Sequence, residues 1–248
     1  MNNSEKIFDR IVKIEYNSIS TKGGADMKIR YIMDFVSDRW QIEKKKMGDS
    51  RGFQPDGFSR RCRTDALFID DFISCLDYAG VAVVLFSKEK TEEFKYDTSG
   101  NINPAKLLKD VEDYVGVVRG KHLEIGGFTR HQVYERESGK TKIKASEFLA
   151  MMHDLGVSVY LRDKKTGYLV CKPSDDGVKQ FIKGVLYNTN RAVPISKSGS
   201  LSELYVTKDD VYLLATYSSS ASTITLLTKE DAEKYMEVNG CEPYDFAE

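Results

Sequence analysis

The chain has 248 residues, of which 41% are hydrophobic and 30% charged, and its formal net charge is −1. This composition is that of a globular protein and excludes low-complexity and collagen-like chains. No apolar run approaches the ~18–20 residues that span a bilayer, and the first residues lack the apolar core of a signal peptide. We therefore expect a cytoplasmic protein without membrane association.

Cysteine and histidine residues are scattered along the chain. The four cysteines and three histidines lack the clustered spacing of a zinc site. We therefore expect reduced cysteines, no metal and no other cofactor. A pocket containing His122, Glu124, Arg130 and His131 could support acid–base chemistry or phosphate binding, although isolated histidines more often have structural roles.

Charge is distributed unevenly despite the small net value. Residues 38–63 hold eight Lys/Arg and four acids, and residues 119–144 hold seven Lys/Arg and three acids, so each segment carries +4. Residues 203–248 hold three Lys and ten acids, which gives −7. This pattern predicts a basic face for a polyanion and an acidic end kept away from it, or an ordinary fluctuation of surface charge.

The first quarter of the chain is expected to form a hairpin and a long loop. Alternation of apolar and polar residues at 11–18 and 27–36 predicts two strands around a Gly-containing turn. The basic segment 38–63 predicts a surface loop with a short helix near 41–47. Its arginines and aromatic residues could stack on nucleic-acid bases, or the aromatic side chains could be buried in the core.

Helix caps and hydrophobic periodicity predict elements in the rest of the chain, where Asn103 and Thr228 are favourable N-caps. These elements are a helix at 64–79, a strand at 81–86, a helix at 104–114, strands at 115–118, 122–125 and 132–135, a loop at 191–200, strands at 211–217 and 223–227, and a helix at 229–238. The pattern predicts an α+β fold with a mixed or antiparallel sheet and packed helices. The chain forms either one domain or two lobes, 1–126 and 127–248.

Residues 144–183 have the most informative local pattern. A helix at 147–155, a β-hairpin with its turn at 164–167 and a second helix reaching Ile182 are expected. The order of helix end, hairpin and P-x-x-x-G within 155–177 resembles the C-terminal half of winged-helix regulators of the multiple-antibiotic-resistance type. That resemblance implies a wing whose tip reaches the phosphate backbone. The alternative is a helix packed on a hairpin inside an ordinary α+β domain.

These patterns predict a protein that binds nucleic acid without catalysing a reaction. The two basic segments and the hairpin tip would contact phosphates, so affinity would fall steeply with salt. The predicted contact residues are Arg60, Arg61, Arg63, Lys140, Lys142, Lys144, Arg162, Lys164 and Lys165. The general character of the chain also suits a phage or mobile-element protein.

Two alternative functions remain open on the sequence. Asp56 followed by Glu93 and Lys95 has the residue order of the PD-(D/E)xK phosphodiesterases, which would make the protein a metal-dependent nuclease. The acidic C-terminal third could instead bind a partner protein, as an inhibitor or adaptor does. Its last residues, including Tyr244-Asp245-Phe246, are similar to the acidic, aromatic-ended tails with which phage and bacterial single-strand-binding proteins recruit partners.

Overall fold

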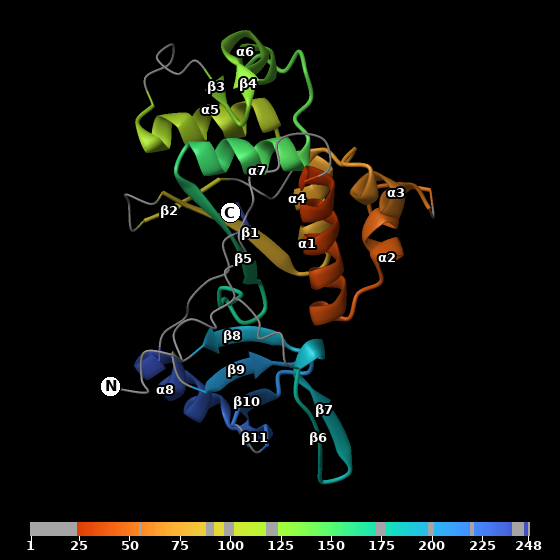
Figure 1. Cartoon of the computed structure of the whole chain (residues 1–248), viewed down its shortest axis with the longest axis vertical. Coiled ribbons are helices and arrows are strands. Elements are labelled where there is room, and N and C mark those ends of the chain that lie inside the picture. The colour runs from red at the N-terminus through yellow and green to blue at the C-terminus, as the bar shows by residue number, and fades with distance from the viewer. Residues whose placement is uncertain are drawn as a thin grey trace, which may run out of the picture.

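Two antiparallel β-sheets lie one above the other along the long axis of the molecule, and most helices surround the upper sheet (Figure 1). The fold is therefore α+β, as the sequence predicts. The computed structural model describes residues 24–54, 56–87, 92–96, 102–117, 124–171, 177–197, 201–218, 221–239 and 246–247.

Four helices open the described part of the chain, and most of the strands follow in its second half. The helices are α1 (Gly24–Trp40), α2 (Lys44–Asp49), α3 (Gly57–Arg63), α4 (Ile69–Tyr78), α5 (Pro104–Val115), α6 (Arg130–Glu137), α7 (Ala145–Asp154), the short 3-10 helix η2 (Thr189–Arg191) and α8 (Lys229–Asn239). The strands are β1 (Val81–Ser87), β2 (Glu93–Phe94), β3 (Glu124–Ile125), β4 (Phe128–Thr129), β5 (Val157–Asp163), β6 (Lys179–Ile182), β7 (Val185–Asn188), β8 (Val193–Lys197), β9 (Ser202–Val206), β10 (Tyr212–Thr216) and β11 (Thr223–Leu227).

The upper sheet has the order β2-β1-β5, and the lower sheet is a meander with the order β11-β10-β9-β8. Strands β1 and β5 pair along their whole length, from Val81 opposite Asp163 to Ser87 opposite Val157. Helix α4 packs against β1, and α7 packs against β5, so their apolar faces cover the sheet. Two smaller hairpins, β3–β4 and β6–β7, form separate two-stranded sheets.

The C-terminal residues return to the upper sheet. The amide of Phe246 donates a hydrogen bond to the carbonyl oxygen of Val159 at 2.8 Å. The Phe246 ring lies 6.0 Å from the ring of Phe35, between centroids. One buried cluster therefore extends from Ile29 in α1 to Ala247.

Several predicted elements are confirmed, and each has a strong local signal. Helix α5 begins as expected, with the Asn103 side chain accepting from the amide of Lys106 at 3.1 Å. Helix α8 begins after Thr228, whose hydroxyl oxygen accepts from the amide of Asp231 at 3.2 Å. Strands β1, β10 and β11 also lie where the sequence places them. The helix predicted at 64–79 is shorter and begins at Ile69.

The prediction of an N-terminal strand at 27–36 is wrong, because these residues form part of α1. Four buried side chains, Ile29, Ile32, Met33 and Val36, recur at the three- and four-residue spacing of a helix. The first strand of that hairpin, at 11–18, lies outside the described residues. The segment 38–63 was predicted to be a loop with a short helix, but it contains both α2 and α3.

The helix–hairpin–helix pattern at 144–183 is confirmed only in its first half. Helix α7 and strand β5 follow the prediction, but the main partner of β5 is β1, and only an isolated bridge joins Arg162 to Leu169. Residues 179–182 form strand β6 where a second helix is expected. The same correction applies to 132–135 and 191–200, which contain parts of α6 and β8 instead of a strand and a loop.

One cysteine differs from the expectation that the cysteines are reduced. Cys62 and Cys75 are free and buried, but Cys171 is disulfide-bonded. Burial raises the pKa of both free thiols to about 12. Among the described helices, none is both long enough and apolar enough to cross a membrane.

Arg39, near the end of α1, joins the upper and lower parts of the molecule. Its side chain is 8% exposed, and its guanidinium donates to the carbonyl oxygen of Ala192 at 3.0 Å and also to that of Thr189. The neighbouring Trp40 donates its indole N–H to Asp163 at 2.7 Å. One end of α1 is thereby bonded both to the residues just before β8 and to the end of β5.

Replacement of Arg39 should destabilise the protein strongly. Arg39→Ala removes the donor of two buried carbonyl oxygens, so we expect the free energy of unfolding to fall by about 2–4 kcal/mol. Arg30→Ala on the same helix is the control, because Arg30 is exposed and forms a surface ion pair with Asp34. The control should cost less than about 0.5 kcal/mol in urea unfolding followed by circular dichroism. Equal losses would contradict this role of Arg39.

The free thiols should react slowly in the folded protein and make stability sensitive to high pH. With the pKa of Cys62 and Cys75 raised to about 12, labelling by a disulfide reagent near pH 8 should require unfolding. Because the folded state favours the protonated thiol, this stabilisation is complete below the unfolded pKa of ~8.5 and is lost as pH rises towards 12. Urea unfolding at a series of pH values measures the loss, and rapid labelling without urea would contradict the prediction.

Candidate nucleic-acid interface

The helices α1 to α4 form a small cluster in which α3 lies on the outside. Helix α3 packs against α1 and α2, and α2 also packs against α4. The buried face of α3 consists of Phe58 and Cys62, which are 1% and 3% exposed. Amphipathic spacing therefore fixes which side of α3 faces the protein and which faces solvent.

Gly48 allows α2 and α3 to lie close together. A Cβ atom at this position would be 2.5 Å from Cβ of Phe58 and 2.9 Å from its Cγ, so only glycine fits without movement. The Phe53 ring packs beside Phe58, with 5.8 Å between centroids. Phe53 and Phe58 thus serve packing, one of the two outcomes that the sequence leaves open.

The outer face of α3 carries arginine side chains. Arg60 and Arg63 are exposed, while Arg61 is half-buried with its guanidinium carbon 5.1 Å from the centroid of the Phe53 ring. The aromatic contact holds the Arg61 side chain against the helix without neutralising its charge. All three residues were predicted contacts, but they lie on a helix and not on a loop.

A second basic segment lies beside the residues that connect α3 to α4. The amide of Ile69 donates to the carbonyl of Ile143 at 3.0 Å, and the amide of Ala145 donates to that of Leu67 at 2.9 Å. This pairing brings the segment after α3 next to the loop before α7. That loop contains Lys140, Lys142 and Lys144, and the Lys142 ammonium lies 5.1 Å from the centroid of the Phe68 ring.

We call these two segments together the α3 basic surface. It consists of Arg60, Arg61, Arg63, Lys140, Lys142 and Lys144. The sequence predicts each of these residues as a contact, but the backbone pairing that makes the two segments neighbours joins residues far apart in the chain.

The other three predicted contacts are occupied within the protein. Arg162 forms a bidentate ion pair with Glu93, with distances of 3.1 and 2.6 Å between the guanidinium nitrogens and the carboxylate oxygens. Lys164 is paired with Asp77, and Lys165 lies 2.7 Å from Asp210. The expected wing tip therefore forms ion pairs with α4 and with the turn between β9 and β10.

Several residues considered for catalysis have other roles in the part of the chain that the structure describes. Glu93 of the PD-(D/E)xK order binds Arg162, and Asp56 precedes α3 as its N-cap residue. His131 is exposed and 3.7 Å from Glu135, whereas His122 lies outside the described residues. The part of the chain that the structure describes contains no group of three or more His, Cys, Asp or Glu side chains that could hold a metal.

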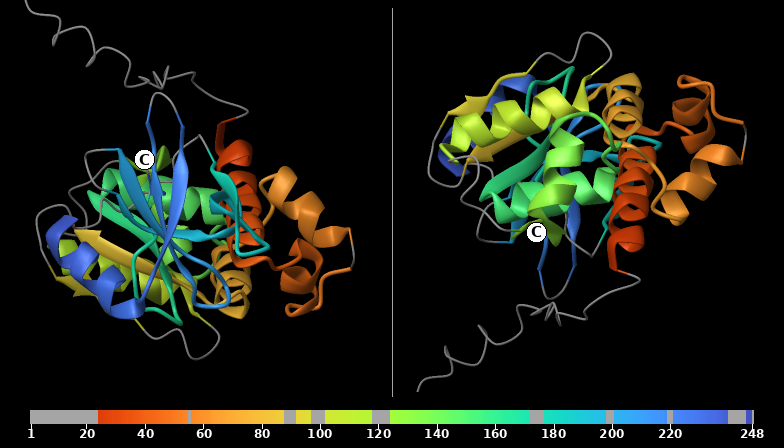
Figure 2. Two further views of the ribbon diagram at one scale, coloured as in Figure 1. Left: turned by 90° about the horizontal axis from the view of Figure 1, so that it is seen from below. Right: turned by 90° about the horizontal axis from the view of Figure 1, so that it is seen from above.

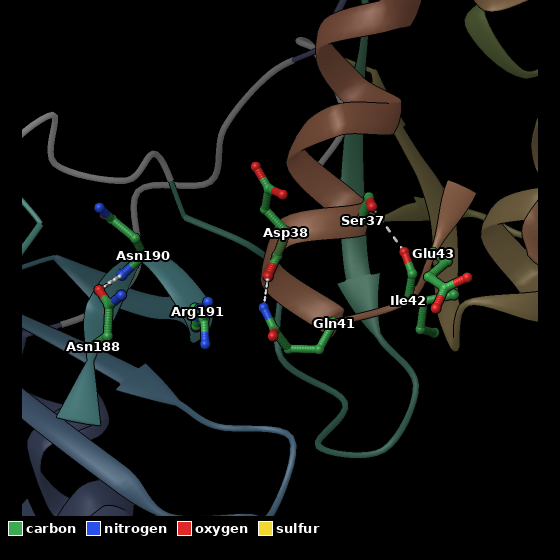
Figure 3. Close-up of a pocket in the computed structure, with 8 residues that line it drawn as sticks. All are labelled: Ser37, Asp38, Gln41, Ile42, Glu43, Asn188, Asn190 and Arg191. Carbon is green, nitrogen blue, oxygen red and sulfur yellow. Dashed lines mark hydrogen bonds between the residues drawn. The ribbon is translucent and has the colours of Figure 1, made fainter. Parts of the chain in front are cut away.

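An open polar pocket of about 400 Å³ lies between the end of α1 and the segment after β7 (Figure 3). Its lining residues are Ser37, Asp38, Gln41, Ile42, Glu43, Asn188, Asn190 and Arg191. The backbone is fixed by local hydrogen bonds, such as that from the Ser37 hydroxyl to the carbonyl of Ile42 at 2.8 Å. Acids and an arginine of opposite charge share this pocket, and sequence patterns did not indicate it.

The acidic helix α8 lies far from the α3 basic surface. Helix α8, with exposed Glu230, Asp231, Glu233 and Glu237, packs against the lower sheet, whereas α3 lies at the opposite upper side (Figure 1). Comparison of the chain with protein-family models, with curated proteins and with solved structures finds no match. The function must therefore be argued from geometry and charge.

The close contact at Gly48 can be tested by adding one methyl group. Gly48→Ala should lower the free energy of unfolding by about 1–2 kcal/mol, because overpacking against Phe58 outweighs the gain in helix propensity. Gly57→Ala is the matched control, since the nearest atom to its added Cβ would be 3.8 Å away. Urea unfolding measures both, and a stabilised Gly48→Ala protein would contradict the proposed packing.

Proposed function

We propose that the protein binds duplex nucleic acid, without catalysing a reaction, by docking α3 on the duplex. The observation that carries this proposal is the outward arginine face of α3, held on α1 and α2 by its buried face. Helix-turn-helix proteins present their second, recognition helix to the major groove in this manner. In this chain seven residues, Ser50 to Asp56, connect α2 to α3, which is longer than the usual turn.

The charges of the α3 basic surface suit the two kinds of contact that such proteins make. Arg60 and Arg63 are exposed on α3, where a guanidinium can donate two hydrogen bonds to a guanine edge. Lys140 and Lys142 lie on the adjacent loop, and an ammonium is suited to a phosphate oxygen. The distance of the acidic helix α8 from α3 in Figure 1 reduces repulsion of a polyanion at this surface.

Binding should depend on the arginines of α3 and on salt. For Arg60→Ala/Arg63→Ala we expect about a tenfold to hundredfold loss of affinity for a duplex oligonucleotide near physiological salt. The slope of log affinity against log salt should fall by about 2 if both side chains contact phosphates, and less if one contacts a base. Fluorescence anisotropy over a salt series, with single-stranded and duplex oligonucleotides, measures both quantities.

The control is Lys229→Ala/Lys234→Ala, which removes the same charge from exposed positions of α8. This variant should bind the duplex with the affinity of the unchanged protein, because the proposed affinity depends on the position of the charges and not on net charge alone. If both double variants lose affinity equally, docking through α3 is wrong. If neither duplex nor single strand binds at low salt, nucleic-acid binding itself is wrong. If the duplex is bound and is cleaved when Mg²⁺ is added, the absence of catalysis is wrong and nuclease activity replaces it.

A further inference from the structure

The β6–β7 hairpin extends away from the lower sheet as a two-stranded ribbon (Figure 1). Its strands pair in register from Lys179 opposite Asn188 to Ile182 opposite Val185. The two turn residues, Lys183 and Gly184, both have positive φ, at 51° and 82°. Two successive positive φ values match the type I′ turn, whose twist suits a tight hairpin, so the arm has a defined shape up to its tip.

The base of the hairpin is held firmly in the protein. The amide of Val178 donates to the hydroxyl oxygen of Thr189 at 2.9 Å, and the amide of Thr189 donates to the carbonyl of Val178 at 3.0 Å. A Cβ atom at Gly177 would lie 2.2 Å from the Asn190 side chain, so the backbone is tightly packed at this point. The Thr189 carbonyl also accepts from Arg39 of α1.

The two faces of the ribbon differ in their surroundings. On the inner face, Ile182 and Tyr187 pack against the small core of the lower sheet, and Gln180 accepts from the amide of Ile224 at 2.6 Å. On the outer face, Phe181 and Leu186 are directly opposite each other across the strands. They are 72% and 52% exposed. Paired apolar side chains exposed on a projecting element are typical of a contact site.

The charges around this apolar pair favour a polyanion as the partner. The segment 177–191 contains Lys179, Lys183 and Arg191 and no aspartate or glutamate. Lysine is depleted from the centres of protein–protein interfaces, where its ammonium must lose water. A nucleic-acid duplex instead offers phosphates for the lysines and, between its base pairs, apolar space for a phenylalanine or leucine.

The position of the hairpin is compatible with a duplex bound by α3. Figures 1 and 2 show the hairpin on the side of the molecule that carries α1, α2 and α3. Arg39 bonds α1 to the residues at the hairpin base, so the two elements belong to one framework.

We propose that the β6–β7 hairpin is a second contact with duplex nucleic acid, where Phe181 and Leu186 insert between base pairs from the minor groove and bend the duplex. Lys179 and Lys183 contact the flanking phosphates. This inference rests on the proposed function, because α3 supplies the first contact. Architectural proteins that insert apolar side chains in this way kink the duplex, so a bend is the specific consequence.

The test uses the full chain and a duplex of roughly 25 base pairs with a donor and an acceptor dye at its two ends. A second duplex carries 2-aminopurine, whose fluorescence rises when base stacking is lost. The unchanged protein should raise energy transfer between the ends and raise 2-aminopurine fluorescence at saturation. Phe181→Ala/Leu186→Ala should abolish both signals and lower affinity by about tenfold, with an unchanged salt slope because no charge is removed.

The matched control is Leu201→Ala/Val238→Ala, which also removes two exposed apolar side chains, 64% and 83% exposed, but outside the hairpin. It should bend the duplex as the unchanged protein does. Since all four positions are exposed, thermal unfolding should show that both variants are folded. Lys179→Gln/Lys183→Gln should keep the bend at saturation but lower the salt slope by about 2.

The outcomes separate this inference from the proposed function. If the unchanged protein binds the duplex without bending it, or if Phe181→Ala/Leu186→Ala bends it fully, the inserted hairpin is wrong while docking through α3 stands. If no duplex binds at low salt, both proposals fail. Sedimentation of the free protein tests whether the hairpin instead contacts a second copy of the chain. A dimer that is lost in Phe181→Ala/Leu186→Ala would assign the hairpin to self-association and overturn the inference.

Discussion

The buried guanidinium of Arg39 is the interaction on which the arrangement of the two halves depends. Removing a charged group from water is costly, and burial accordingly lowers the pKa of Arg39 from its usual value. The cost is offset because the carbonyl oxygens of Thr189 and Ala192 accept its N–H groups. Arginine suits this position because its usual pKa is so high that the side chain stays charged at physiological pH.

The neighbouring contact of Trp40 explains why the expected wing tip does not face solvent as a free cationic loop. Asp163 is 7% exposed and accepts from the Trp40 indole, from the amides of Lys165 and Thr166, and from the Thr166 hydroxyl. These bonds fix the turn after β5. The side chains of Lys164 and Lys165 then meet Asp77 and Asp210. A phosphate contact by either lysine would have to replace an ion pair, whereas Arg60 and Arg63 lie exposed on α3.

Local signals predicted much of the fold but only part of the site. Helix α5 follows from Asn103-Pro104 and helix α8 from Thr228, because caps act on the adjacent residues. The apolar residues of Met27–Val36 fit both the alternation of a strand and the spacing of a helix. The segment forms a helix because its apolar face is buried against the other helices. Charge alone made the arginines of α3 candidates, whereas the position of Lys142 beside the residues that follow α3 depends on the long-range pairing of Ile69 with Ile143. The sequence did not predict the role of Gly48, because that role depends on the close approach of Phe58 in the folded protein.

The position of α1 has a further consequence for recognition. Helix α3 packs on α1, and the base of the β6–β7 hairpin is bonded to the end of α1 through Arg39. The two proposed contacts therefore share one helix, and neither can move far without breaking a buried interaction. Two rigidly connected contacts lose less conformational entropy on binding than two independent ones. They also fix the path that a duplex must follow. A straight duplex that cannot reach both contacts would have to bend, and part of the binding free energy would offset the cost of bending.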